Sequence, residues 1–386
     1  IYVGRKNGVK TQGGIYHYLY NEETQKLSLL GLEDVLQGFT YIALTYNRTR
    51  LAATGQDSEG HDLLVGYQLD TQDKRLKRCG QDRVGTAGDI CHLSVNRAGT
   101  LLLVTDFVDK AVHFYEFLPN GAPGAFLARV PFEGKSTGYR QGSSHPHSAY
   151  FSPDDRYALV ADLGANTVWG LRCQPADNRF DLVGSWRAPD GYGPRHIAFH
   201  PNGKYVYVLM EITGHIAVLE LHSNGQLTLI ELIFAVSPAH ETVEGSLNAA
   251  DILVDMKGER LYASYRSVQE IDVFGIDRRT GKLSPLGYAP TRGMVRGLHW
   301  GRSGVLCALG EELPQVDGGV RVPVYSQRKR LAEKTEQAGN AKGENQREPQ
   351  GFYRHVPDML MVAQGMAARN FRDEQGGQRR ENAGGV

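Results

Sequence analysis

The feature that most constrains the fold of this chain is a recurring unit of two short apolar runs joined by a polar turn. The unit is clearest at 145–160 and starts again at 193–208. Apolar runs on both sides of a tight polar turn are typical of a β-hairpin. The predicted turn centres repeat at intervals of roughly 50 residues, and they are Thr49, Gly99, Asp155, Gly203, Gly258 and Gly304.

Each unit contains further short strands after its hairpin. A second apolar stretch follows, as at 112–117 and 216–221, and Gly- and Asn-containing turns such as 119–121 and 223–225 come next. Four short strands in about 50 residues, without helical periodicity, are typical of one propeller blade. The six complete units and a seventh split between the chain ends predict an all-β, seven-bladed β-propeller of four-stranded blades.

The ends of the chain should close this ring. Residues 1–4 and 14–20 match the later strands of a unit and lack the first, so we expect a C-terminal strand to pair with the N-terminal segment and remove the exposed edges. We predict a propeller domain at 1–326. Residues 327–386 are expected to form a charged, largely disordered tail, in which the segment near 352–364 is a candidate for the closing strand or for a short helix.

Composition argues against several classes of partner. Lys plus Arg and Asp plus Glu both number 43, so charge does not favour binding to nucleic acid or to an anionic membrane. No apolar run approaches the ~18 residues of a membrane span. The four cysteines lack metal-like spacing, and three lie in apolar runs, as expected of buried thiols in a reducing compartment. We therefore expect a cytoplasmic protein, of unknown oligomeric state, that uses no cofactor.

The positions of the turns also predict which ionisable residues lie close together in the fold. Positions equally far from a hairpin turn lie at the same open end, so residues of one register position should ring one mouth of a central channel. A non-catalytic ring of charges that pair blade to blade would have the same pattern. Eight residues before the turns stand Tyr41, Cys91, His147, Arg195, Ala250 and Arg296, and eight after them stand Asp57, Phe107, Leu163, Glu211, Arg266 and Glu312.

Several of these segments resemble one enzyme family. The stretch 193–208, together with 91–95, 145–148, 152–154 and 161–164, is similar to the seven-bladed propeller lactonases, the 6-phosphogluconolactonase-like group. The resemblance covers roughly 1–310 and extends to fungal 3-carboxy-cis,cis-muconate lactonizing enzyme. It implies that His147, Arg195, Glu211 and Arg266 are catalytic. We expect His92, His145 and Arg296 to contact the substrate.

The resemblance implies hydrolysis of the internal ester of an anionic sugar lactone. Arginines suit the anion and the developing oxyanion, and a histidine or a carboxylate can move the proton. The division of labour between His147 and Glu211 stays open at this point. No metal is expected at the site, although four histidines, His145, His147, His196 and His200, cluster along the sequence. A lactone-forming cycloisomerase and a non-catalytic propeller scaffold are the alternatives.

Overall fold

The computed structural model describes residues 1–6, 12–21, 24, 26–70, 72–84, 89–234, 236–291, 293–300, 306–310 and 360–363. Within these ranges the chain is almost entirely β-structure, with two short 3-10 helices, η1 (Pro175–Asp177) and η2 (Pro238–Thr242). Neither helical segment has the length and apolar character that a membrane-crossing helix needs. The predicted all-β propeller with four-stranded blades is therefore confirmed.

The strands within the described residues form seven sheets, of which five have four strands and two have three. Each four-stranded sheet is an antiparallel meander of consecutive strands. The bounds of the first three four-stranded sheets are β4 (Gln37–Leu44), β5 (Arg50–Gln56), β6 (Asp62–Leu69) and β7 (Leu76–Arg83); β8 (Ile90–Val95), β9 (Leu101–Asp106), β10 (Ala111–Phe117) and β11 (Pro123–Pro131); and β12 (Pro146–Phe151), β13 (Tyr157–Asp162), β14 (Thr167–Gln174) and β15 (Arg179–Arg187).

The other four sheets include the two with three strands, which come from the two ends of the chain. The two remaining four-stranded sheets hold β16 (Pro194–Phe199), β17 (Tyr205–Met210), β18 (Ile216–Leu221) and β19 (Leu227–Ile233), and β20 (Ala249–Val254), β21 (Arg260–Tyr265), β22 (Glu270–Ile276) and β23 (Leu283–Pro290). The three-stranded sheets hold β1 (Tyr2–Arg5), β2 (Gly14–Asn21) and β3 (Lys26–Val35), and β24 (Val295–Trp300), β25 (Leu306–Gly310) and β26 (Leu360–Ala363).

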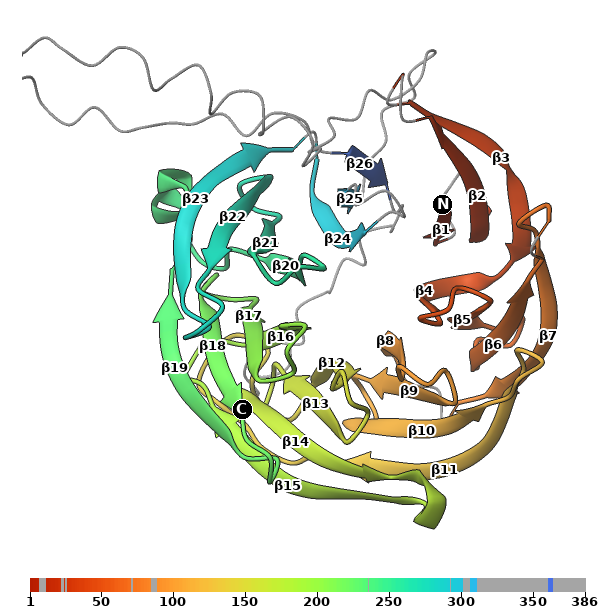
Figure 1. Ribbon diagram of the computed structural model, residues 1–386, viewed down its shortest axis with the longest axis horizontal. Coiled ribbons are helices and arrows are strands. Elements are labelled where there is room, and N and C mark those ends of the chain that lie inside the picture. The colour runs from red at the N-terminus through yellow and green to blue at the C-terminus, as the bar shows by residue number, and fades with distance from the viewer. Residues whose placement is uncertain are drawn as a thin grey trace, which may run out of the picture.

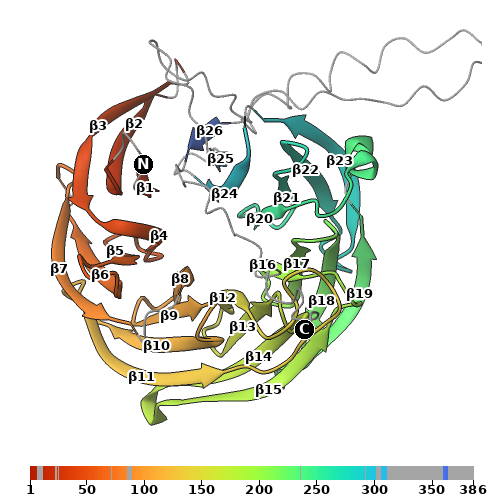
Figure 2. The same cartoon turned by 180° about the vertical axis from the view of Figure 1, so that it is seen from behind.

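The sheets are arranged around a central axis (Figures 1 and 2). The first strand of each of the six predicted hairpins lies nearest the centre, and the later strands follow outward; these first strands are β4, β8, β12, β16, β20 and β24. The strand before each predicted turn is therefore the innermost strand of its sheet. The residues at its open end face the axis of the ring.

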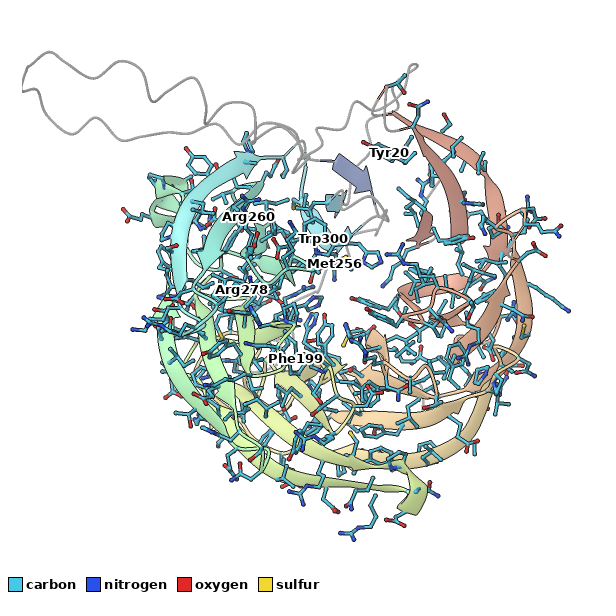
Figure 3. The ribbon with its side chains drawn as sticks, in the orientation of Figure 1. Tyr20, Phe199, Met256, Arg260, Arg278 and Trp300 are labelled. Atoms are coloured by element: carbon cyan, nitrogen blue, oxygen red, sulfur yellow. The ribbon has the colours of Figure 1, made fainter. Side chains whose placement is uncertain are left out.

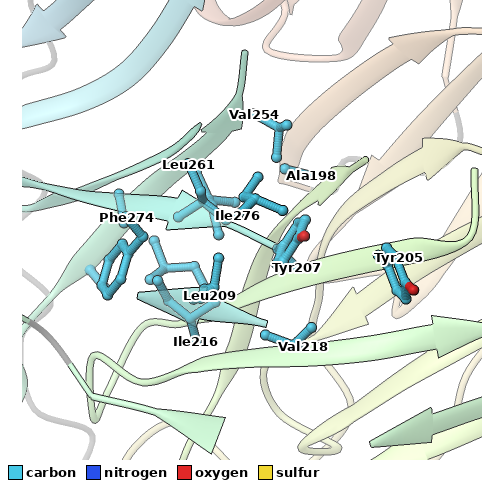
Figure 4. Packing of buried hydrophobic residues seen from close by; sticks show 14 of the residues in the cluster. Ala198, Tyr205, Tyr207, Leu209, Ile216, Val218, Val254, Leu261, Phe274 and Ile276 are labelled. Atoms are coloured by element: carbon cyan, nitrogen blue, oxygen red, sulfur yellow. The ribbon is translucent and has the colours of Figure 1, made fainter. Parts of the chain in front are cut away.

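Apolar side chains between neighbouring sheets hold the ring together. The largest cluster joins the β16–β19 sheet to the β20–β23 sheet and includes Tyr207, Leu209, Ile216 and Phe274, all of which are fully buried (Figure 4). Burying each such side chain stabilises the fold by about 1.5–3 kcal/mol. Further apolar clusters lie between other neighbouring sheets, such as the one that holds Leu103, Phe114 and Leu171 between the β8–β11 and β12–β15 sheets.

The hairpin turns repeat one backbone design. In the β16–β17 turn the His200 and Tyr205 backbones pair, and Gly203 has a φ of 72°, a left-handed conformation that favours glycine. The equivalent residue of the β4–β5 turn is Arg48, with a φ of 57°, whereas the sequence analysis centred this turn on Thr49. That prediction was wrong by one residue, because no glycine marks the turn.

The C-terminal strand differs from the expected closing strand. The candidate segment 352–364 does contain β26, but β26 pairs in parallel with β25 and not with the N-terminal sheet β1–β2–β3. The prediction that this segment pairs with the N-terminal strands is therefore wrong for residues 360–363. The rest of the predicted tail, 327–359 and 364–386, lies outside the described residues, and so do the Gly304 turn and Glu312.

Candidate active site

A cavity of ≈ 1900 Å³ follows the axis of the ring. Its wall is built by the innermost strands, and both ends of these strands contribute to it. At the open-end mouth it is lined by polar and charged residues such as Arg140, His147 and Glu211. At the turn-side mouth it is lined by Phe199, Met256 and Trp300, which lie on one side of the central opening in Figure 3, and by polar residues of the β4–β5 turn, such as Arg48. The open-end mouth is the one that holds a buried carboxylate surrounded by arginines.

β-bulges place the key side chains at the open-end mouth. In five sheets, the pairing of the innermost strand with its neighbour shifts by one residue near the open end. His147 and Arg195 are the extra residues in β12 and β16. A bulged residue leaves the hydrogen-bond ladder, and its side chain is re-aimed out of the regular alternation. Consequently, both Arg195 and the next residue, His196, line the cavity.

Glu211 is the centre of the charged cluster at this mouth. It follows β17 directly and is only 4 % exposed. Its Oε2 lies 2.8 Å from Nε of Arg195 and 3.8 Å from Nε2 of His147. Its Oε1 accepts hydrogen bonds from Nη2 of Arg266 at 3.2 Å and from Nη1 of Arg140 at 3.1 Å. The structure thus brings together the four residues that the family resemblance implies, and adds a fifth.

The electrostatics of the cluster favour an ionised carboxylate. Burial by itself would raise the pKa of Glu211, but the guanidinium groups of Arg195, Arg266, Arg140 and Arg296 outweigh burial and lower this pKa to about 2. A carboxylate with so low a pKa is a weak base. Glu211 is therefore suited to hold the arginines in place, and the arginines leave this mouth attractive to an anion.

His147 is neutral at physiological pH. Burial, followed by the positive charges of Arg195 and the other arginines at the mouth, lowers its pKa well below the ordinary histidine value. Its Nδ1 is buried and has no hydrogen-bond partner among the described residues. Because a neutral imidazole with an unpaired nitrogen can accept a proton, His147 meets the first requirement for a general base.

A second layer of polar side chains lies one residue deeper in the cavity. It holds a hydrogen-bonded pair, in which Nδ1 of His196 lies 2.7 Å from Oδ1 of Asp251. The His92 ring packs between Tyr41 and Tyr150, with ring centroids 4.3 and 4.4 Å away. Tyr41, His92, His196 and Asp251 occupy equivalent positions of their innermost strands, so the repeat builds most of this layer as well as the mouth.

The three predicted substrate contacts lie at different depths. His145 lies at the mouth, where its ring stacks on Phe107 at 4.3 Å between centroids and Nδ1 lies 3.1 Å from the Phe107 carbonyl oxygen. Arg296 lines the cavity, and its charge acts on Glu211 and Arg195. His92 belongs to the deeper layer and is fully buried, and among the described residues no ion pair joins it to the charged cluster.

Sequence reasoning missed two parts of the site. Arg140 stands outside the hairpin register, in the connection between β11 and β12, and it reaches Glu211 across 71 residues of sequence. Only the loop composition around it, rich in Gly and Ser, hinted at a connection that could approach the channel. The Asp251 carboxylate was also missed, although it occupies the same register position as His196 in the next unit.

None of the described groups that could hold a metal ion lies at this mouth. The three clusters of suitable side chains among the described residues are Asp57, Glu59 and His61; Asp106, Asp109 and His113; and His240, Glu270 and Asp272. Within the described residues, the charged cluster around Glu211 thus offers arginine cations in place of metal ligands.

Comparison with known proteins places this geometry in a family. The profile of the family described as "Lactonase, 7-bladed beta-propeller" matches residues 1–313. The chain is 28 % identical over 290 residues to 6-phosphogluconolactonase of Bacillus subtilis, covering 74 % of this chain and 81 % of that protein. It is 26 % identical over 300 residues to 6-phosphogluconolactonase of Formosa agariphila, covering 76 % and 83 %.

Solved structures agree on the fold. The periplasmic gluconolactonase of Pseudomonas aeruginosa superimposes with a TM-score of 0.71 at 21 % identity, over 80 % of this chain and 88 % of that one. At this identity the likeness concerns the fold alone. The match of the family profile extends over most of the chain and includes every innermost strand that carries the site. This chain therefore belongs to the lactonase family of seven-bladed β-propellers.

Proposed function

We propose that this protein hydrolyses the internal ester of an anionic sugar lactone, in the manner of a 6-phosphogluconolactonase. One observation carries the proposal: Arg140, Arg195, Arg266 and His147 converge on the buried Glu211 at one mouth of the axial cavity. The names of the curated relatives support the same reaction class. A cavity of ≈ 1900 Å³ is large enough to admit a phosphorylated sugar.

The arginines divide between substrate binding and charge stabilisation. The side chains of Arg266 and Arg140 are 13 % and 34 % exposed, so their guanidinium groups can reach a phosphate or carboxylate of the substrate. Arg195 is 2 % exposed and tied to the Ala250 carbonyl oxygen as well as to Glu211. We assign Arg195 and Arg266 to the lactone carbonyl oxygen, where negative charge develops.

His147 is the group that moves the proton. Its neutral imidazole accepts a proton from the attacking water, whose oxygen bonds to the lactone carbonyl carbon. The ring C–O bond then breaks, and the imidazolium returns the proton to the departing alkoxide oxygen, which gives the open hydroxy acid. Glu211 stays ionised because its pKa is about 2, so its part is to hold the arginines and to face the imidazolium.

We also propose that the seven sheets are the seven blades of one ring. The family description names seven blades, and the strands that the structure describes form seven sheets around one axis, which supports this proposal. On this view the two three-stranded sheets, β1–β2–β3 and β24–β25–β26, are the blades formed at the two ends of the chain. The arginine at the β24 bulge, Arg296, then completes the charged mouth.

The test is a substrate comparison with a variant pair. Purified protein is mixed with 6-phosphoglucono-δ-lactone, with δ-gluconolactone and with 3-carboxy-cis,cis-muconate, and ring opening or closure is followed by NMR above the spontaneous rate. We expect opening of the phosphorylated lactone, and a loss of about 10²–10³ in rate for Arg266→Ala. Arg156→Ala is the matched control, since Arg156 is an exposed arginine at a turn that pairs with Asp154.

Three outcomes would contradict the proposal in different ways. Ring closure of carboxymuconate without lactone opening would identify a cycloisomerase. Activity toward none of the three compounds would favour a non-catalytic scaffold. If Arg266→Ala keeps full activity, the charged cluster takes no part in the mechanism, even if the protein opens the lactone.

A further inference from the structure

We propose that His240, Glu270 and Asp272 bind a divalent transition-metal cation, such as Zn²⁺, at a structural site distinct from the axial cavity. His240 lies in η2, and Glu270 and Asp272 lie two residues apart at the start of β22, on the same face of the sheet. η2 is drawn as the short coiled ribbon beside β23 in Figures 1 and 2. The site therefore joins a connecting loop to the sheet that follows it.

The candidate ligand atoms are buried and lack hydrogen bonds. The side chains of His240 and Asp272 are 0 % exposed, and that of Glu270 is 12 % exposed. Nε2 of His240, Oε2 of Glu270 and Oδ1 of Asp272 have no hydrogen-bond partner among the described residues. A buried polar atom without a hydrogen-bond partner destabilises the fold, so three such atoms close to one another indicate a missing partner.

The geometry suits a small cation. Nε2 of His240 lies 3.7 Å from Oε2 of Glu270 and 3.9 Å from Oδ1 of Asp272, and the three atoms lie within 4.8 Å of one another. Ligand atoms of a tetrahedral zinc site are about 3.4 Å apart, given bonds of about 2.0–2.1 Å. A small contraction of the site would bring the three atoms to this spacing, and a solvent molecule would complete the coordination.

Protein cations neutralise the other two clusters of this kind. Arg83 pairs with Asp57 at 2.7 Å and Arg129 pairs with Asp109 at 2.8 Å. Within the part of the chain that the structure describes, no lysine or arginine lies within 4 Å of Glu270 or Asp272, and His240 is their one ionisable partner. Two buried carboxylates without a neutralising arginine are the surroundings that a bound cation would stabilise.

The surrounding residues would keep the ion in place. Oδ2 of Asp272 accepts a hydrogen bond from the Val236 backbone N–H at 2.6 Å, which orients the carboxylate. The Tyr265 ring packs against His240 with a centroid distance of 4.3 Å, and its hydroxyl donates to the Gly214 carbonyl oxygen at 3.0 Å. An aromatic wall on one side and an oriented carboxylate on the other give the site a fixed shape.

The position of the site suggests its purpose. The loop that contains η2 continues into residues that support the charged cluster: Ala249 N donates to the Glu211 carbonyl oxygen at 3.0 Å, and Nε of Arg266 donates to the Asn248 carbonyl oxygen at 2.8 Å. A cation that ties η2 to β22 would restrict this loop. The metal would thus stabilise the fold and position Arg266 without touching the substrate.

The experiment measures metal binding directly on the full chain. Protein stripped with EDTA and dialysed is titrated with ZnCl₂ by calorimetry, and bound zinc is counted by mass spectrometry. We expect one ion per chain and a rise in Tm of about 4 °C at saturating Zn²⁺. His240→Gln and Glu270→Gln should each abolish both effects. His113→Gln is the matched control, because His113 is a buried histidine that lies 2.9 Å from Asp109 in another sheet.

Zinc binding in His113→Gln should equal that of the parent protein. Absence of a saturable site in the parent protein, or one zinc per chain retained in both His240→Gln and Glu270→Gln, would overturn the proposal. If both variants fail to fold, the parent titration still decides, because an unchanged Tm with Zn²⁺ contradicts the site. None of these measurements depends on lactone hydrolysis, so the proposed function can fail separately.

Discussion

Two clusters in this protein each contain a buried carboxyl group, whose pKa is lowered in one cluster and raised in the other. At the mouth of the axial cavity, Glu211 is surrounded by guanidinium groups, which lower its pKa to about 2. Beside η2, burial and then Glu270 raise the pKa of Asp272 to about 7. Both carboxylates are almost fully shielded from solvent. The difference teaches that the position of cations, and not the degree of burial, decides whether a buried acid in this ring is charged.

The first prediction compares the loss of stability when each of the two carboxyl groups is replaced. Glu211→Ala leaves buried arginines without their anion and should lower the free energy of unfolding by about 3–5 kcal/mol, as measured by urea denaturation. Asp272→Asn in zinc-free protein replaces a carboxyl group whose charged form has no cation nearby, so it should change stability by less than about 1 kcal/mol. Glu220→Ala, at the exposed Lys204 pair, is the control and should cost about 0.5 kcal/mol or less. Equal losses at Glu211 and Asp272 would contradict the contrast.

The second prediction concerns the group that moves the proton. His147→Gln keeps a polar side chain of similar size but cannot accept a proton, so kcat should fall by about 10²–10⁴ with little change in KM. His92→Gln, one layer deeper, should lower kcat by less than about 10-fold, because His92 lies outside the charged cluster. Initial rates of opening of 6-phosphoglucono-δ-lactone measure both. A larger fall in kcat for His92→Gln than for His147→Gln would show that His92, and not His147, moves the proton.

The third prediction separates binding from chemistry within the arginine cluster. Arg140 comes from a loop and its side chain is 34 % exposed, so Arg140→Ala should raise KM by about 10-fold and leave kcat nearly unchanged. Arg187→Ala is the control, since Arg187 is an exposed arginine that pairs with Asp190. A fall in kcat without a change in KM would move Arg140 into the chemical step.

The fourth prediction is the smallest effect and concerns pH. Burial and the neighbouring arginines lower the pKa of His147, so the imidazole stays neutral above the ordinary histidine value of about 6.5. Consequently, kcat/KM should vary by less than about 2-fold between pH 6.5 and 8 and should fall only at lower pH.

The same lowered pKa has a consequence for stability, with a definite sign. The unfolded chain protonates this histidine below about pH 6.5 whereas the folded protein does not, so the contribution to stability is lost as pH falls below that value. Glu211 also has a lowered pKa, so its contribution is present above its unfolded value and is lost as pH falls toward about 2. For the activity, a kcat/KM that already falls at pH 7.5 as the pH is lowered would show that His147 is not the base.

Much of the fold could be predicted from the repeat. The turns after β8, β12, β16 and β20 have the expected glycine or aspartate in the left-handed conformation, at Gly99, Asp155, Gly203 and Gly258. The β4–β5 turn was misplaced by one residue because Arg48 adopts that conformation without a glycine signal. The C-terminal strand was mispaired because a four-residue apolar strand carries no information about its partner.

The site could be predicted to the extent that it follows the repeat. His147, Arg195 and Arg296 share one register position, and Glu211 and Arg266 share another, so a constant offset from each turn was enough to group them. Arg140 lies outside this register, and no periodic signal connects it with Glu211. The bulges that turn His147 and Arg195 toward the axis were also invisible, because a bulge changes pairing without changing the local pattern of apolar residues.

The sequence by itself determined the ring of β-hairpins and the phase of the residues at its mouth, because both follow from a period that one strand and one turn already contain. Only the tertiary structure decided which side chains meet across units: the fifth member of the charged cluster, the depth of His92, and the convergence of His240 with Glu270 and Asp272. The physical reason is that these contacts join residues without a common period. Their partners are chosen by how the loops pack over the sheets.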